Sequence, residues 1–196
     1  MTATLVDVTP DAERKIATYA AICYDASTDE DAVERRLCKL LNLGHLATLR
    51  FASATFLVSD ISRACSHQLV RSKHLDFLQE SQRYVKQTDV EFVSPNHNDL
   101  YHDAYIAALD YYNKLIALGE RKENARFVLP NAATTRLYVT GNFQAWKDFL
   151  KLRQDKAAQW EIRNVADEVA LQLYAVAPNI FNGEEDVARS RNSPTA

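Results

Sequence analysis

Residues that turn the chain are scarce in this sequence. Only 4 glycines and 5 prolines occur among 196 residues. An all-β fold with many tight turns needs more of both residue types, and collagen-like or low-complexity chains need far more. The length suffices for one domain with a sizeable core. The sequence therefore predicts one folded domain and argues against a loop-rich all-β protein.

Hydrophobic periodicity predicts an α+β fold with few strands. Alternating or β-branched residues predict strands at 52–58 and 134–140, and the segment after residue 74 is also expected to end in a strand. Apolar residues at helical spacing predict the helices. These helices are expected at 11–24, 31–41, 61–71, 101–118, 121–128, 143–153 and 162–173. A single domain is expected over 1–181, followed by a mobile polar tail at 182–196.

Charge and cysteine usage exclude several classes of protein. A net charge of -3 gives no overall attraction to nucleic acid polymers or membranes, and the apolar runs are too short to span a bilayer. The N-terminus lacks the features of a signal peptide. Cys23, Cys38 and Cys65 fit neither a disulfide framework nor a zinc site, and the histidines lack metal-ligand spacing, so no metal is predicted. We expect free thiols in a reducing cytoplasm.

The densest polar cluster runs from residue 68 to residue 84. Arg71, Lys73 and Arg83 supply three cations, with amides and hydroxyls between them. Arginine pairs bidentately with phosphate, and serine hydroxyls and backbone amides can complete a phosphate cradle. A charge run of this kind can equally form a solvated basic turn. Both interpretations stay open from the residues alone.

Two further arginines lie beside apolar residues. Arg153 continues the apolar helical face that begins at Phe143, so its guanidinium is expected to point inward and to need a partner. That partner is either an anionic ligand or an internal carboxylate, Glu161 or Asp155. Arg126 stands directly before an apolar run. No G-x-G-x-x-G or P-loop motif is present, so arginines converging on one anion favour a phosphorylated small molecule held in another way.

The polar cluster resembles the signature of the flavin-dependent thymidylate synthases. That signature has Arg-His-Arg, then seven residues, a serine and, one residue on, Arg-Tyr; residues 68–85 here are QLVRSKHLDFLQESQRYV. Blocks at 125–131 with 138–142, and at 149–153 with 158–163, agree with the family as well. The resemblance covers nearly the whole chain in order, from about residue 15 to 181. The early matches are Cys23-Tyr24 and Gly44-His45.

This resemblance implies a fold, an activity and an assembly. The fold has helices around a small, mostly antiparallel sheet, and the domain at 1–181 is catalytic. The activity is C5-methylation of a uridine 5′-monophosphate, with methylenetetrahydrofolate as carbon donor, FAD as cofactor and NADPH as reductant. The substrate is dUMP, or UMP as in nucleoside-antibiotic (polyoxin-type) biosynthesis, and no cysteine attacks the pyrimidine. The assembly is a cytoplasmic homotetramer whose sites combine residues of several subunits.

The resemblance also assigns residues. Arg153 is the catalytic residue, because a fixed cation stabilises the negative charge that develops in the uracil ring. The substrate-binding residues are Gln68, Arg71, Ser81, Gln82, Arg83, Arg126 and Arg153. The cofactor-binding residues are Ser53, Arg71, Ser72, Lys73, Gln79, Asn142, Gln144 and Asp148.

The chain departs from the family pattern on the flavin and folate side. Each change removes a donor, weakens a bidentate cation or adds an anion, while the nucleotide arginines are spared. We therefore expect weaker FAD retention or altered redox behaviour, and a nucleotide-binding paralogue without turnover remains the alternative to a working enzyme. The changes are Arg71-Ser72-Lys73 for Arg-His-Arg, Phe51 and Ala157 for two histidines, and Asp148 for an Asn or His.

Overall fold

Four strands form one antiparallel sheet in the computed structural model, which describes residues 1–96 and 98–184. Their spatial order is β1-β2-β4-β3, so the sheet brings together strands from both halves of the chain. The strands are β1 (Thr2–Val8), β2 (Ser53–Ser62), β3 (Leu75–Gln79) and β4 (Thr134–Asn142). This arrangement confirms the expected α+β fold with a small antiparallel sheet.

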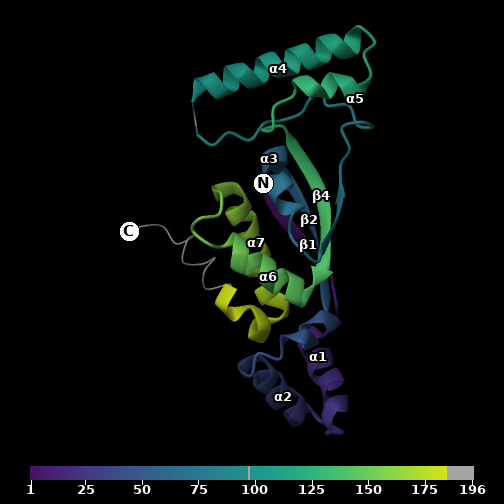
Figure 1. Ribbon diagram of the computed structural model, residues 1–196, viewed down its shortest axis with the longest axis vertical. Coiled ribbons are helices and arrows are strands. Elements are labelled where there is room, and N and C mark those ends of the chain that lie inside the picture. Colours follow the sequence, from purple (N-terminus) through teal and green to yellow (C-terminus); the bar gives the residue numbers. More distant parts are fainter. Residues whose placement is uncertain (97, 185–196) are drawn as a thin grey trace.

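Helices cover one face of the sheet and extend the molecule at both ends (Figure 1). The covering helices are α3 (Arg63–Leu69), α6 (Phe143–Arg153) and α7 (Trp160–Val176). One end of the molecule holds α4 (Asp99–Ala117) and α5 (Lys122–Ala125), and the other holds α1 (Ala12–Ala21) and α2 (Glu30–Asn42). Short 3-10 helices are η1 (Ile22–Tyr24), η2 (Leu46–Phe51) and η3 (Arg126–Val128).

The core lies between the sheet and its covering helices. Alternate residues of β2 point inward, and Phe56 is fully buried against the ring of Trp146, 5.0 Å between centroids. Trp146 Nε1 donates to the carbonyl of Ala54 at 3.0 Å, which ties α6 to β2. Leu150 and Ile162 complete the buried layer from α6 and α7. The apolar alternation expected at 52–58 is therefore the inner face of a strand, as an antiparallel sheet with one covered face requires.

Other apolar side chains are left in solvent by the single chain. Leu78 and Tyr138 lie opposite each other on β3 and β4, on the uncovered face of the sheet, and are 77% and 46% exposed. Leu100 and Tyr111 of α4 are also exposed, and Tyr112 is the buried residue of that helix. The apolar stripe expected on this helix is thus buried only in part. Within the described residues, no helix is both long and apolar enough to cross a membrane.

The region between β2 and α3 differs from the sequence prediction. The helix expected at 61–71 begins at Arg63 instead, because β2 continues to Ser62. Asp60 adopts a left-handed conformation with φ 57°, and the pairing register with β4 shifts between Val58 and Ile61. This bulge lets the strand continue, and Ser62 then caps α3 by accepting from the backbone of Cys65 at 2.9 Å. Strand β1 was not predicted.

The C-terminal boundary also lies later than expected. Residues 178–184 are helical, whereas the polar tail was placed from 182 onward. Lys147 Nζ contacts the carboxylate of Glu184 at 2.9 Å and donates to the carbonyl of Ile180 at 2.7 Å. These contacts hold the last described turn against α6. The rest of the expected tail, 185–196, lies outside the described residues.

Candidate functional site

Helix α3, which leads into the polar signature, is fixed to α7 by a buried carboxylate. Glu161 accepts from the backbone N and the Oγ of Ser62, both at 2.6 Å. Both side chains are almost fully buried. Hydrogen bonds to a buried charged acceptor are stronger than neutral ones, so they hold the start of α3 in place. The helix then delivers Gln68 and the turn that follows it.

The turn between α3 and β3 lies directly against the end of β4. Leu75 pairs with Gly141, and His74 adopts a left-handed conformation with φ 64°. A Cβ on Gly141 would lie 2.3 Å from Leu75 Cδ2 and 3.3 Å from the carbonyl oxygen of His74. A side chain at this position would require the Leu75 side chain to move and the His74 carbonyl to shift, so the packing favours glycine. The neighbouring pair Ser53 and Asn142 then lies at the same end of the sheet.

We call this region the turn end: Ser53, residues 70–74 and residues 141–144. Most of the residues expected to bind the cofactor gather here, which their separation in sequence did not ensure. Arg71 and Lys73 are exposed, and among the described residues neither forms an ion pair. Ser72 Oγ and Gln144 Oε1 are buried without a hydrogen-bond partner there. The turn end thus offers two free cations and two unused polar atoms.

Three expected cofactor ligands have other partners. Asn142 Oδ1 accepts from the backbone of Ala145 at 2.9 Å and caps α6. Asp148 accepts from Gln144 Nε2 at 2.9 Å. Gln79 lies at the far end of β3, where its Nε2 donates to the hydroxyls of Ser66 and Thr135. Gln79 is therefore separate from the turn end in this chain.

Arg153 ends α6 beneath α3, as its place on the apolar face predicted. Its Nη2 donates to the carbonyl of Gln68 at 2.9 Å, and its Nε is buried without a partner among the described residues. The internal ion pair with Glu161 or Asp155 is not formed in the described residues, because Glu161 accepts from Ser62 and Asp155 Oδ1 accepts from the backbone N of Ala157. Arg153 is thus a half-buried cation with spare donor capacity.

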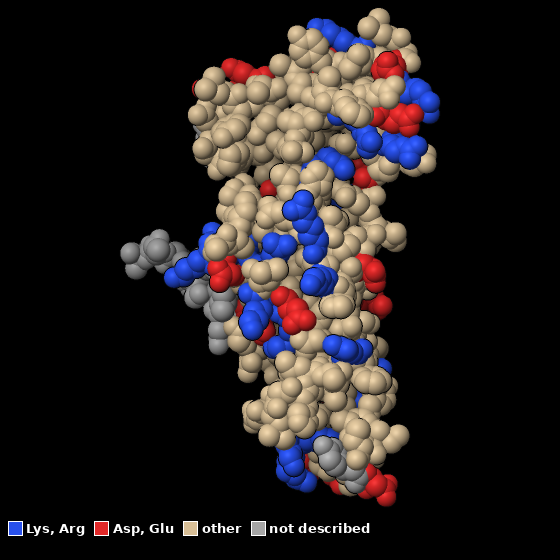
Figure 2. Space-filling view, viewed as in Figure 1, with Lys and Arg blue, Asp and Glu red and all other residues tan. Residues whose placement is uncertain are grey.

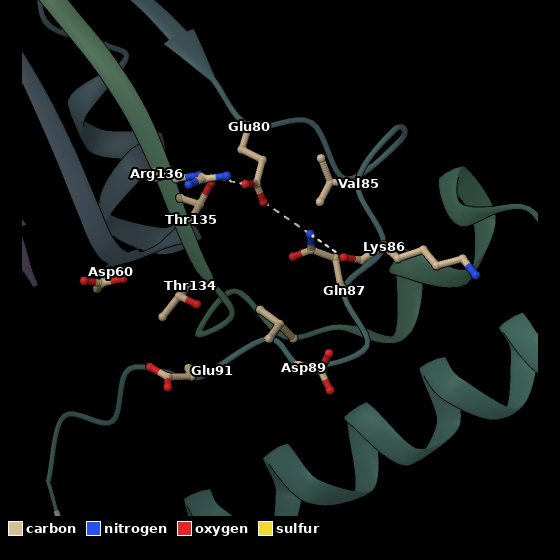
Figure 3. A pocket seen from close by; sticks show the side chains of 11 residues that line it. Asp60, Glu80, Val85, Lys86, Gln87, Asp89, Glu91, Thr134, Thr135 and Arg136 are labelled. Atoms are coloured by element: carbon tan, nitrogen blue, oxygen red, sulfur yellow. Dashed lines mark hydrogen bonds and ion pairs between the residues drawn. The ribbon is translucent and has the colours of Figure 1, made fainter.

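A second charged region occupies the other end of β3. Glu123 contacts Arg83 Nε at 3.3 Å and Arg121 Nη2 at 2.7 Å, and its carbonyl accepts from Arg126 Nε at 3.2 Å. Glu80 contacts Arg136 Nε at 2.9 Å (Figure 3). We call this group the arginine cluster: Arg63, Arg83, Arg121, Arg126 and Arg136, with Glu80 and Glu123. Three of the five arginines, Arg83, Arg121 and Arg136, therefore contact the two carboxylates.

The expected ligands Ser81 and Gln82 lie in the turn beside this cluster. Ser81 Oγ accepts from the backbone of Arg83 at 3.3 Å, and its carbonyl accepts from Val85 at 2.9 Å. Gln82 is buried, and its Nε2 has no partner in the part of the chain that the structure describes. The turn therefore presents Arg83 toward α5 and keeps Gln82 inside.

A cavity of about 420 Å³ adjoins the arginine cluster (Figure 3). Carboxylates dominate its wall, since Asp60, Asp89 and Glu91 line it beside the paired Glu80 and Arg136. Such a wall disfavours an anion. A phosphate group is therefore better placed on the Arg83 and Arg126 side of the cluster than in this cavity.

Single-chain geometry keeps the two charged regions apart. Strand β3 runs from Leu75 to Gln79, so its ends are about 13 Å apart. Arg71 and Lys73 stand at one end, and Arg83 stands at the other. On the face drawn in Figure 2, Lys and Arg side chains gather over the middle of the molecule, and mixed charges gather near α5. The expected site residues do not converge within one chain.

Four charged residues of the cluster were not singled out from the sequence: Arg63, Arg121, Glu123 and Arg136. Arg121 and Glu123 lie in a mixed charge run that looks like any solvated turn. Arg136 alternates outward on a strand, which is typical of a surface position. Arg63 opens a helix and carries no local signal. Their part in the cluster becomes visible only from the contacts they make in the folded chain.

Comparison with known proteins gives consistent matches. The family model described as "Thymidylate synthase complementing protein" matches residues 4–179. A flavin-dependent thymidylate synthase of Geobacter sulfurreducens is 38% identical over 195 residues, covering 90% of this chain and 84% of that protein. One of Mycobacterium tuberculosis is 39% identical over 164 residues, covering 72% of this chain and 66% of that protein.

A solved structure resembles the chain in fold. It is Thymidylate Synthase X from Helicobacter pylori with FAD and dUMP, and it aligns with a TM-score of 0.81. The alignment covers 96% of this chain and 100% of that chain at 19% sequence identity. At this identity the likeness supports the fold, while the sequence matches carry the relationship.

Proposed function

Because the chain belongs to the flavin-dependent thymidylate synthase family, we propose that it methylates C5 of a uridine 5′-monophosphate. In this proposal methylenetetrahydrofolate is the carbon donor, FAD the cofactor and NADPH the reductant. The family match over residues 4–179 includes every residue to which we assign a role. The single observation that carries the chemistry is Arg153, a half-buried cation that keeps an unpartnered Nε within the described structure.

Arg153 supplies the electrostatic part of the reaction. C5 of uracil becomes nucleophilic when the ring is polarised, which places negative charge on the ring at N3 and O2. A guanidinium fixed in advance stabilises that charge without reorganisation. The hydrogen bond from Nη2 to Gln68 orients the guanidinium, which leaves its other donors for the ring. The free thiols of Cys23, Cys38 and Cys65 have no role in this scheme.

The turn end fits a flavin dinucleotide by the chemistry of its donors. Arg71 and Lys73 would bind the pyrophosphate, and Ser72 and Gln144 would use their unpartnered oxygens toward polar groups of the cofactor. Once bound, FAD would supply the two-electron chemistry that this chain's own side chains lack. Asp148 adds a negative charge beside Gln144, which weakens the fit for an anionic cofactor. We therefore propose FAD binding that is weaker than with Arg-His-Arg.

We propose that the active form is a homotetramer with shared sites. One chain holds Arg71 and Arg83 at opposite ends of β3, so one phosphate group cannot meet both. The exposed Leu78, Tyr138 and Leu100 provide apolar surface for contacts between copies. Residues from different chains would then complete one site. The enzyme is proposed to act in the cytoplasm, without binding nucleic acid polymers or membranes.

The substrate is either dUMP or UMP. The chain's departures on the flavin side suit a divergent branch that methylates UMP, as in nucleoside-antibiotic biosynthesis. The relatives that match are named thymidylate synthases, which favours dUMP. A pocket rejects one added hydroxyl poorly when only apolar contacts oppose it, so use of both nucleotides is physically reasonable.

A second function is favoured by the altered signature. Ser72 and Lys73 replace the histidine and second arginine, so a nucleotide-binding paralogue without turnover is the alternative. Incubation with FAD, NADPH, methylenetetrahydrofolate and either UMP or dUMP decides between them. Product mass should rise by one methyl group on at least one nucleotide, and omission of the folate should abolish the product. Nucleotide binding without product under these conditions would support the paralogue.

A further inference from the structure

A cavity of about 510 Å³ lies along α2, at the end of the molecule that also holds α1 (Figure 1). Part of its lining is apolar, where Leu40 is buried and Leu43 is 57% exposed. The exposed side chains of Arg35, Lys39 and His45 make the rest of the lining basic. No carboxylate lines this cavity within the described residues. We call it the basic pocket, and its charge favours an anionic ligand that also has apolar parts.

The three cations of α2 differ in what they do for the fold. Arg36 joins two segments, because its Nη1 donates to the carbonyl of Ala17 at 3.1 Å and its Nη2 to that of Ser27 at 2.6 Å. Neither Arg35 nor Lys39 forms an ion pair in residues 1–96 or 98–184. The fold of the single chain therefore depends on Arg36, while the other two cations remain free for a ligand.

The spacing of the two free cations indicates what kind of anion fits. Arg35 and Lys39 stand four residues apart on α2, so their side chains share one face of the helix, one turn apart. Asp29 lies before the first turn, where it accepts from the backbone N of Ala32 at 2.8 Å, and does not reach Lys39 near the other end of the helix. A compact phosphate is matched best by guanidiniums that converge on it. Separated cations beside apolar residues suit carboxylates that are spaced along a flexible chain.

Helix η2 joins the basic pocket to the turn end. It begins directly after His45 and ends at Phe51, two residues before Ser53. Six residues of 3-10 helix span at most about 12 Å. η2 also packs against α6, which starts at Phe143 in the turn end. A ligand held at the turn end can therefore reach the basic pocket with an extended tail.

We infer that the basic pocket binds the γ-glutamyl tail of methylenetetrahydrofolate, an inference that rests on the proposed function. The carbon donor must approach the flavin, which the proposed function places at the turn end. Behind its reactive rings a folate carries one or more γ-linked glutamates, whose free carboxylates are separated by methylene groups. These carboxylates pair with Arg35 and Lys39, and the methylene groups pack on Leu43. Helix α2 then gives the enzyme a preference for folates with several glutamates.

The experiment measures this preference by calorimetry on the full chain loaded with FAD and dUMP. The probes are pteroylmonoglutamate and pteroylpentaglutamate, which have the same rings and differ only in the tail. The pentaglutamate should bind about fivefold to twentyfold more tightly at low salt, since each exposed charge pair contributes modestly and several add together. Arg35→Gln with Lys39→Gln should reduce the preference to less than about twofold and leave monoglutamate affinity nearly unchanged. High salt should weaken the preference of the wild type in the same direction.

Two further double variants separate the pocket from overall charge. Arg14→Gln with Lys15→Gln is the matched control, because it removes the same charge from α1, where Arg14 lines a different cavity. This control should keep the preference. Arg35→Glu with Lys39→Glu should invert it, so that the pentaglutamate binds more weakly than the monoglutamate. Arg36 stays intact throughout, because its two hydrogen bonds stabilise the fold.

Each other outcome counts against the inference. Equal affinity of the wild type for both probes overturns it, and so does a preference that survives Arg35→Gln with Lys39→Gln. Loss of the preference in the α1 control would assign the effect to overall charge. Displacement of the pentaglutamate by an equal concentration of inorganic phosphate would make the pocket a phosphate site instead. A chain that binds neither probe and forms no methylated product overturns the proposed function itself, which distinguishes that failure from the failure of the tail site alone.

Discussion

The two ends of β3 hold their cations in opposite ways. At the turn end the backbone is fixed by Gly141 packing, while Arg71 and Lys73 extend into solvent without partners among the described residues. In the arginine cluster ion pairs hold the side chains, because Glu123 contacts both Arg83 and Arg121 and Glu80 contacts Arg136. An arginine without an ion-pair partner can be replaced by lysine with little loss of folding stability. Replacing an arginine whose carboxylate partner also contacts a second arginine disturbs that second arginine as well. The departures from the family signature lie at the turn end, as this difference requires.

The largest effect is expected at Arg153, which lies beneath α3 and belongs to neither end. Arg153→Lys keeps the charge but loses the planar fork and the contact to Gln68. Turnover should fall by about two orders of magnitude or more, as when one transition-state donor is removed. Product formation under saturating substrates measures it, with circular dichroism as the check on folding. Near-normal turnover would remove Arg153 from the proposed chemistry.

Rigidity of the turn end can be broken at Gly141. Gly141→Ala places a methyl group 2.3 Å from Leu75 Cδ2 and 3.3 Å from a backbone oxygen, so the buried Leu75 side chain must repack and the backbone at His74 must shift slightly. We expect a loss of about 1–3 kcal/mol in the free energy of unfolding, typical of overpacking. Urea titration measures it. Gly183→Ala is the matched control, because nothing lies within 4 Å of its added methyl. Equal stability of the two variants would show that the turn end accommodates the added methyl group without loss of stability.

The freedom of the turn-end cations can be tested by restoring the family signature. Ser72→His with Lys73→Arg recreates Arg-His-Arg, and the new arginine can bind phosphate with two parallel hydrogen bonds. FAD affinity should improve several-fold, or on the order of 1 kcal/mol. Fluorescence titration of both proteins with FAD gives the comparison. Unchanged or weaker affinity means that Ser72 and Lys73 belong to a remodelled site with its own geometry.

The smallest effect is expected from the cysteines. Burial, with a smaller contribution from nearby Glu161, raises the pKa of Cys65 to about 12, so its thiol stays protonated at neutral pH and is a poor nucleophile. Cys23→Ser, Cys38→Ser and Cys65→Ala combined should leave turnover within a factor of about two, since no covalent step uses a thiol. Alkylation of the native protein at pH 8 should label only the exposed Cys23 and Cys38. A folded triple variant without activity would instead point to covalent catalysis.

Local patterns predicted the elements whose burial repeats along the chain. The alternation ending at Val58 and the helical face from Phe143 to Arg153 are both inward-facing in the structure. Strand β1 escaped prediction because its residues show little alternation and it pairs with β2, some fifty residues away. The bulge at Asp60 depends on a backbone conformation that residue type does not specify.

For the site as well, local sequence patterns were predictable and contacts between distant segments were not. Arg153 was found because an arginine on an apolar helix face is locally anomalous. The resemblance supplied Ser81, Arg83 and Arg126, and the structure adds that they lie away from Arg71. Arg63 could not be found from the sequence, because its enclosure and its neighbour Arg126 come from distant parts of the chain. The position of Glu123 between two arginines is equally non-local.

The close packing of Gly141 also limits how this sequence can diverge. Because a side chain there would displace Leu75 and the His74 carbonyl, a substitution at residue 141 would disturb the packing of residues 74–75. Mutational change at this end of the sheet must therefore act on the solvent-facing side chains of the turn. Single substitutions at Ser72 or Lys73 would change the charge and hydrogen-bond donors around the proposed cofactor site while the chain still folds. Packing at Gly141 thus constrains the backbone of this turn, while its exposed side chains can be exchanged with little effect on folding.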